Sequence, residues 1–260
     1  MTELLATTSY GEPGDVPLVI AHGLFGSARN WRTLARQFAT DRQVVCVDMR
    51  NHGTSFWSDE MDYPAMAGDL AEVIGTLGGR ADVLGHSMGG KAAMTLAINR
   101  PSMVRSLSVA DIAPVAYSHT QMPVLRAMQK LDLATVTKRS AAQKALADLT
   151  GDLGLGAFLT QSLEFDGTAA RWLLNLDALA SNMDALIGFP SDLGRYDGPT
   201  FLIRGSESDY VTRAHSAAIG THLGHVRYTT IEGAGHWLHA EKPSDFIAAT
   251  QRFLASVEPA

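Results

Sequence analysis

A serine between glycines is the residue in this sequence best suited to covalent chemistry. The run GHSMGG places Ser87 between Gly85 and Gly89, in the pattern Gly-x-Ser-x-Gly. An apolar strand-like stretch, ADVL, precedes the run and a helix-like stretch follows it, which is the context in which this pattern presents a nucleophile. The glycines are needed because a serine at such a sharp turn has strained backbone, and side chains two residues away on either side would collide with it. The pattern therefore predicts a nucleophilic hydroxyl near a helix N-terminus, where negative charge is stabilised.

A serine nucleophile needs a base and a site for the negative charge of the tetrahedral intermediate. The run GAGHW supplies His236 after the last apolar stretch, so we expect His236 to accept the proton of Ser87 and return it to the leaving group. The segment HGLFGS follows the first strongly apolar stretch, and we expect the backbone N–H groups of Leu24 and Met88 to form the oxyanion hole. We interpret His22, which opens this segment, as a histidine that orients the loop.

The acid that orients His236 has two candidates. Many proteins with this arrangement carry the acid three residues past a glycine, after a strand such as PTFLIRG, but Ser208 occupies that position here. Asp209 is one residue away, whereas Asp111 follows the preceding apolar run and could reach the far ring nitrogen of His236 from the end of that strand. We favour Asp111 and keep Asp209 as the alternative. With Asp111 as the acid, Ser208 is expected to hydrogen-bond within the same group.

Apolar runs that alternate with helical patterns must position these residues. Runs rich in β-branched residues favour parallel strands buried on both faces, and they cover 17–23, 44–50, 81–87, 104–114, 199–205 and 225–236. Helical patterns cover 31–39, 65–77, 88–100 and 243–257. The alternation predicts an α/β fold with a right-handed, doubly wound, mostly parallel sheet. Ligands bind at the carboxyl ends of such strands, where the polar residues singled out above lie.

One long stretch interrupts this alternation. Residues 118–190 contain only helix-like segments and no strand of the buried parallel type. A structureless loop of this length is rare in a compact domain. We therefore predict a small helical cap, residues 118–190, over the carboxyl edge of a core formed by 1–117 and 191–260. Some apolar residues of the cap should face the substrate, because acyl pockets are largely apolar.

Composition excludes several classes of function. The chain has 260 residues, 46% of them hydrophobic, and a formal charge of −6 with scattered basic residues, so we expect no nucleic-acid or anionic-membrane partner. No apolar run is long enough to span a membrane, and the first residues lack signal-peptide features. Cys46 is the one cysteine, so no internal disulfide can form. We therefore expect a cytoplasmic protein. His236 and His239 are three residues apart without other ligands, so no metal or other cofactor is expected. No pattern indicates an oligomeric state.

These motifs together resemble one family. HGLFGS, DMRNHGTS, DYPAMAGDL, GHSMGGKAAM, ADIAPV and GAGHWLHAEKP are similar to the YbfF-type bacterial esterases and the related mitochondrial α/β-hydrolase-domain proteins. The resemblance implies an α/β-hydrolase fold, a helical cap, a crevice for fairly large acyl substrates and a Ser-His-Asp-Ser group at Ser87, His236, Asp111 and Ser208. Asp209 departs from the pattern, since the family commonly has Ser-Pro-Tyr-Val where this chain has SDYV. The cap matches less well, apart from Trp172 and Asn175.

The expected function is hydrolysis of a small-molecule carboxylic ester or acyl thioester through an acyl-enzyme on Ser87. The residues expected to contact substrate are Phe25, His52, Trp172, Asn175, Tyr210 and Trp237. Because fold alone does not determine function, two alternatives stay open. One is a small-molecule receptor that retains the same residues, and the other is a lactonase or perhydrolase that uses the same group of side chains.

Overall fold

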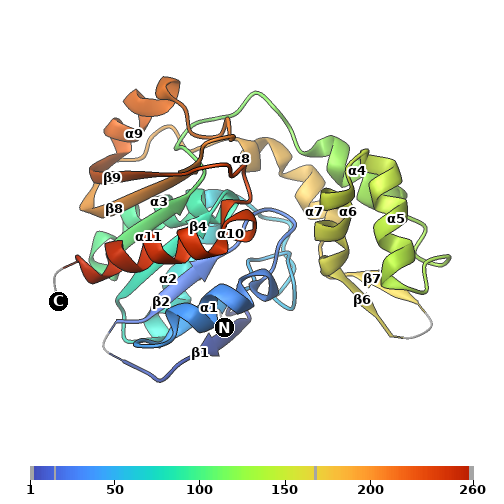
Figure 1. The fold of residues 1–260 in the computed structure, drawn as a ribbon, viewed down its shortest axis with the longest axis horizontal. Helices are drawn as coiled ribbons and strands as arrows, with labels where there is room; N and C mark the ends of the chain where they lie inside the picture. The colour runs from blue at the N-terminus through green and yellow to red at the C-terminus, as the bar shows by residue number, and fades with distance from the viewer. Residues whose placement is uncertain (1–2, 15, 167–168, 258–260) are drawn as a thin grey trace.

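A seven-stranded, mostly parallel sheet forms the centre of the molecule (Figure 1). The computed structural model describes residues 3–14, 16–166 and 169–257. The strand order is β1-β3-β2-β4-β5-β8-β9, and β1 alone pairs antiparallel with its neighbour. The strands are β1 (Thr7–Tyr10), β2 (Leu18–Ala21), β3 (Val44–Val47), β4 (Ala81–His86), β5 (Val104–Ala110), β8 (Tyr196–Gly205) and β9 (Leu223–Ile231). The predicted doubly wound sheet is confirmed. Only β1, a short and largely exposed edge strand, was not predicted.

Helices cover both faces of the sheet. On one face lie α1 (Arg32–Phe38) and α11 (Pro243–Ala255), and on the other α2 (Tyr63–Thr76) and α3 (Met88–Asn99) (Figure 1). Each face has its own buried apolar cluster because the strands are buried on both sides. The remaining core segments are α9 (Ser216–His222), α10 (Leu238–Glu241) and the 3-10 turns η1 (Ala28–Trp31), η2 (Pro101–Met103) and η4 (Arg213–His215).

The segment between β5 and β8 forms a separate lobe, on the right in Figure 1. It contains α4 (Met122–Lys130), α5 (Arg139–Thr150), α6 (Leu153–Leu159), η3 (Thr160–Ser162), β6 (Leu163–Phe165), β7 (Ala170–Trp172), α7 (Leu176–Ser181) and α8 (Met183–Ile187). The expectation of helix alone is wrong at β6 and β7, which form an antiparallel pair. Strands of three residues are too short to show an alternating pattern in sequence. We call this lobe the cap; its limits at 118 and 190 stay a prediction.

Hydrogen bonds attach the cap to the core at several places, two of them at the start of α7 and the end of α8. Near the start of α7, the Asn175 N–H donates to the Asn51 carbonyl at 3.0 Å, and the Asn175 Nδ2 to the Asn51 Oδ1 at 3.1 Å. At the end of α8, the Lys91 Nζ donates to the carbonyls of Ile187 at 3.0 Å and Gly188 at 2.5 Å. The cap is therefore held against the loop after β3 and against the helix that follows Ser87.

Two further features bear on the expectations from composition. Across the described ranges, no helix is both long and apolar enough to cross a bilayer.

Cys46 is buried in β3, and burial raises the pKa of its thiol to about 12. A thiol with so high a pKa is a poor nucleophile at neutral pH, because the reactive species is the thiolate.

Candidate active site

Ser87 lies at the sharp turn between β4 and α3. Its backbone has φ 53° and ψ −120°, a strained conformation for a residue with a side chain. A Cβ atom at Gly85 would lie 2.2 Å from the Gly89 carbonyl oxygen, and one at Gly89 would lie 2.4 Å from the Ala21 carbonyl oxygen. Both positions therefore require glycine, which is the reason the Gly-x-Ser-x-Gly pattern predicted this turn.

The structure brings Ser87, His236 and Asp111 together from three separate loops. The His236 Nε2 lies 3.0 Å from the Ser87 Oγ, and the His236 Nδ1 lies 2.8 Å from the Asp111 Oδ2. Ser87 follows β4, Asp111 follows β5 and His236 lies in the loop after β9. All three are at the carboxyl edge of the sheet, as the strand–helix alternation predicted.

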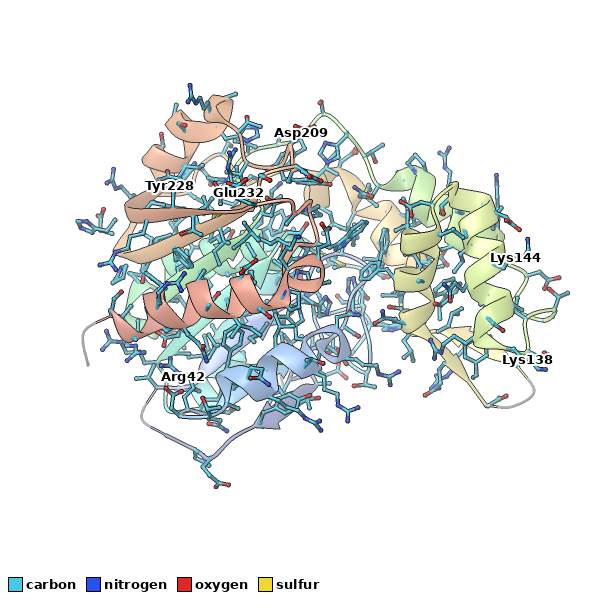
Figure 2. The ribbon with its side chains drawn as sticks, viewed as in Figure 1. Arg42, Lys138, Lys144, Asp209, Tyr228 and Glu232 are labelled. Carbon is cyan, nitrogen blue, oxygen red and sulfur yellow. The ribbon has the colours of Figure 1, made fainter. Side chains whose placement is uncertain are left out.

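Asp111 sits in a fully buried pocket of hydrogen-bond donors. The Ser208 hydroxyl donates to its Oδ2, and the Gly205 N–H donates to its Oδ1 at 3.1 Å. Asp111 has φ 51°, and its N–H donates to the Ile203 carbonyl of β8, which sets the direction of the side chain. The rival acid Asp209 is exposed on the surface of the core (Figure 2). Of the two candidates, Asp111 is the one placed against His236.

Tyr210 covers the other side of the histidine. Its ring stacks on the His236 imidazole with centroids 3.8 Å apart and planes 16° apart. The Tyr210 N–H donates to the Ser208 Oγ at 3.2 Å, and its carbonyl accepts from the Tyr117 hydroxyl at 2.6 Å. Tyr210 therefore connects the group around Asp111 to the segment that leads into the cap.

Leu24 and Met88, the residues whose backbone N–H groups are expected to form the oxyanion hole, line the same cavity as Ser87. In the described chain, neither N–H donates a hydrogen bond to another protein group. Met88 is the first residue of α3, where helix N–H groups have no partner within the helix. The Gly23 position next to Leu24 has no room for a side chain, because a Cβ there would lie 2.9 Å from His86 Nδ1.

Two buried histidines hold the loop that carries Leu24. The His22 Nε2 accepts from the Met49 N–H at 3.0 Å, so its Nδ1 carries the proton and donates to the Gly23 carbonyl at 2.8 Å. His52 accepts from the Phe25 N–H through Nε2 at 3.2 Å, with its Nδ1 2.9 Å from the Arg50 carbonyl. His22 thus takes the loop-orienting place that the sequence indicated.

A cavity of about 230 Å³ lies over Ser87, between the core and the cap. Of the residues expected to contact substrate, Phe25, Tyr210 and Trp237 line it. The other three do not: His52 is buried beneath the loop, Trp172 packs against the apolar core from β7, and Asn175 caps α7 and docks the cap. Asparagine favours that N-cap position, which explains its presence without a substrate contact.

Lys91 is the main residue of this cavity that the sequence analysis did not identify. It is 1% exposed and lines the cavity one helical turn after Ser87. Its Nζ lies 4.7 Å from the centroid of the Tyr117 ring and 5.6 Å from that of Tyr63. Burial lowers its pKa to about 7. Its position four residues after Ser87, one turn into α3, is the signal that could have identified it.

Buried neutral histidines near the site predict a loss of stability in acid. Burial lowers the pKa of His52 and of His239 to about 3, whereas an imidazole in the unfolded chain titrates near 6.5. Below pH 6.5 the unfolded state binds protons that the folded state does not bind until about pH 3. The free energy of unfolding should therefore fall as pH drops through this window, by about 2 kcal/mol per histidine at pH 5.

Urea unfolding at pH 7 and pH 5 measures this loss. In His239→Phe the acid-induced loss should be smaller, because phenylalanine has no nitrogen that titrates. An aromatic ring still stacks on Trp31, and the buried Nδ1, which has no partner in the described residues, is removed. His225→Phe, at an exposed position, is the matched control and should behave as the wild type. Equal losses in the wild type and in His239→Phe would show that His239 does not contribute.

Comparisons with known proteins identify the family of this chain. A family model described as "Alpha/beta hydrolase family" matches residues 18–250; the chain belongs to the α/β-hydrolase family. It is 34% identical to "Esterase YbfF" of Escherichia coli, over 96% of this chain and 97% of that protein. It is 39% identical to the mouse "sn-1-specific diacylglycerol lipase ABHD11", over 92% of this chain and 80% of that protein. A solved structure titled "Marine microorganism esterase" matches with a TM-score of 0.92 and 33% identity, over 97% of this chain and 100% of that one.

Proposed function

We propose that this protein is a serine hydrolase that cleaves carboxylic esters or acyl thioesters through an acyl-enzyme on Ser87. The observation that carries the proposal is the continuous chain of hydrogen-bond contacts from Ser87 through His236 to Asp111, with distances of 3.0 and 2.8 Å. These distances are within reach of direct proton transfer. The names of the relatives, an esterase and a diacylglycerol lipase, support an ester substrate.

In the first half of the reaction, the His236 Nε2 takes the proton of Ser87 as the Oγ attacks the acyl carbonyl. The carbonyl oxygen becomes an oxyanion, which the N–H groups of Leu24 and Met88 stabilise. His236 then gives its proton to the leaving alcohol or thiol, and the acyl group stays on Ser87. In the second half, a water molecule attacks the acyl-enzyme by the same steps and releases the acid.

Asp111 is assigned the role of orienting the base. Its Oδ2 accepts from the His236 Nδ1–H, which leaves Nε2 free to accept the serine proton. Ser208 and the Gly205 N–H hold the carboxylate in place through hydrogen bonds to its two oxygens. Because these donors favour the charged carboxylate, they help it to stabilise the imidazolium that forms in the transition state.

The cavity walls indicate the acyl portion of the substrate. Side chains from the core and the cap contribute apolar surface, among them Phe25, Ile112, Val124, Leu155 and Phe158. Such a lining suits an alkyl chain. We further propose a cytoplasmic location, because Cys46, the one cysteine of the sequence, has no partner for an internal disulfide.

The proposal is tested with p-nitrophenyl esters and acyl thioesters of increasing chain length. We expect turnover of members of at least one of the two series, and covalent labelling of Ser87 by a fluorophosphonate probe located by peptide mass spectrometry. A protein that binds these compounds without turnover, and that the probe does not label, would instead be a receptor built on this fold. Lactones and peracid formation, assayed in parallel, distinguish the other hydrolase chemistries.

A further inference from the structure

Phe25 has an unusual backbone conformation next to the proposed oxyanion hole. It follows Leu24 directly and has φ 64°, in the left-handed region that residues with a side chain rarely occupy. Its side chain lines the cavity. The direction of the Leu24 N–H depends on the backbone on both sides of it, so the conformation of Phe25 bears directly on the position of this donor.

Hydrogen bonds from two different parts of the fold hold Phe25 in this conformation. On the core side, the Phe25 N–H donates to the His52 Nε2 at 3.2 Å. On the cap side, the Ser162 hydroxyl donates to the Phe25 carbonyl at 2.7 Å. His52 is completely buried and Ser162 is 3% exposed. Both polar groups of the Phe25 backbone are thus satisfied inside the protein.

The protonation state of His52 lets its Nε2 accept the hydrogen bond from the Phe25 N–H. Its Nδ1 lies 2.9 Å from the Arg50 carbonyl, and a carbonyl can only accept a hydrogen bond. The proton of the neutral ring is therefore on Nδ1, which leaves Nε2 as an acceptor for the Phe25 N–H. Burial lowers the pKa of His52 to about 3, so this tautomer persists at neutral pH.

Ser162 is held in place by the cap. It is the last residue of η3, directly before β6, and its carbonyl accepts from the Leu173 N–H at 2.9 Å. The same part of the cap reaches the His52 loop, where Leu174 forms an antiparallel bridge with His52. The positions of His52, Ser162 and Phe25 are therefore determined jointly by the core and the cap.

We propose that Ser162 and His52 are positioning residues for the oxyanion hole: they hold Phe25 in its left-handed conformation and thereby direct the Leu24 N–H towards the reacting carbonyl. It follows that the hole is complete only when the cap is seated on the core. The inference rests on the proposed function, since an oxyanion hole matters only if Ser87 attacks a carbonyl.

The test compares Ser162→Ala with the wild type. Removal of the hydroxyl leaves the Phe25 carbonyl without its donor, so the strained backbone should relax and move the Leu24 N–H. We expect kcat to fall about tenfold, less than the ~10²–10³ lost when such a donor is removed outright, with KM within about twofold. The affinity for a trifluoromethyl ketone, which forms a tetrahedral oxyanion on the serine, should fall by the same factor as kcat.

Matched variants control for nonspecific effects. Ser181→Ala, at an exposed serine of α7 in the same cap, should leave kcat, KM and inhibitor affinity unchanged. Ser162→Thr retains the hydroxyl and should retain most of kcat. Thermal unfolding of each variant confirms that it is folded under the conditions of the assay.

Two outcomes would overturn the inference. If Ser162→Ala raises KM and leaves kcat and trifluoromethyl ketone affinity unchanged, Ser162 supports substrate binding through the Phe25 ring and does not position the hole. If all parameters equal those of the wild type, the cap hydroxyl has no role in the reaction. Failure of the wild type to turn over any ester, in contrast, would contradict the proposed function and not this inference alone.

Discussion

Replacing Ser87 by alanine is expected to lower kcat for ester hydrolysis by about 10⁶, because no other group can form the acyl-enzyme. The Ser87 Oγ is the atom that contacts the His236 Nε2, and Cys46, the one alternative thiol, is buried in β3. Steady-state rates with a p-nitrophenyl ester, together with the loss of fluorophosphonate labelling, measure the effect. A residual rate about 10³–10⁴ above that in water should remain, supplied by the oxyanion hole and by substrate binding.

The fold should tolerate this substitution. Alanine removes one hydroxyl, and the turn is determined by Gly85 and Gly89, which cannot hold side chains. We expect the thermal midpoint of Ser87→Ala to stay within a few degrees of the wild type, since substitutions that remove no packing usually change stability by less than about 0.5 kcal/mol. A folded Ser87→Ala protein that still hydrolysed esters at the wild-type rate would rule out Ser87 as the nucleophile.

Asp111→Asn is expected to lower kcat by about 10⁴, the effect of the equivalent change in a serine protease. An asparagine amide can donate to the His236 Nδ1, which would move the ring proton to Nε2, the atom that must accept the proton of Ser87. The neutral amide also cannot stabilise an imidazolium. KM should change little, since Asp111 is buried and is not among the residues that line the cavity.

Asp209→Asn is the matched control for this prediction. It also replaces an aspartate by asparagine, but at an exposed position that takes no part in the hydrogen bonds of His236. We expect kcat and KM within about twofold of the wild type, as for most surface substitutions. If Asp209→Asn abolished activity and Asp111→Asn did not, our assignment of the acid would be wrong.

Much of the reaction centre was predictable because its motifs are local. The glycines around Ser87 all lie in one turn, so they appear as a short pattern in the sequence, although the contact that excludes a side chain at Gly89 comes from Ala21 of β2. The same holds for the buried parallel strands, whose continuous apolar runs gave the sheet and its carboxyl edge. His236 could be placed because the chain order of the fold puts the base after the last strand.

The remaining features depend on contacts between residues far apart in the chain. A choice between Asp111 and Asp209 requires knowing which carboxylate meets His236, a contact across 125 positions that no local pattern encodes. The contacts of the cap could not be predicted for the same reason. Asn175 and His52 were both expected to contact substrate, but Asn175 hydrogen-bonds to Asn51 and His52 accepts from the Phe25 N–H.

The sequence by itself thus indicated Ser87 and His236 as candidate nucleophile and base, the sheet that carries them and the presence of an inserted segment, because the glycine motif and the burial pattern are each confined to a few neighbouring residues. Only the tertiary structure decided which acid lies beside the base, that Lys91 lines the cavity, and that the cap contacts the oxyanion loop through Ser162. The physical reason is that these contacts form only when separate elements pack together, and packing is a property of the whole chain.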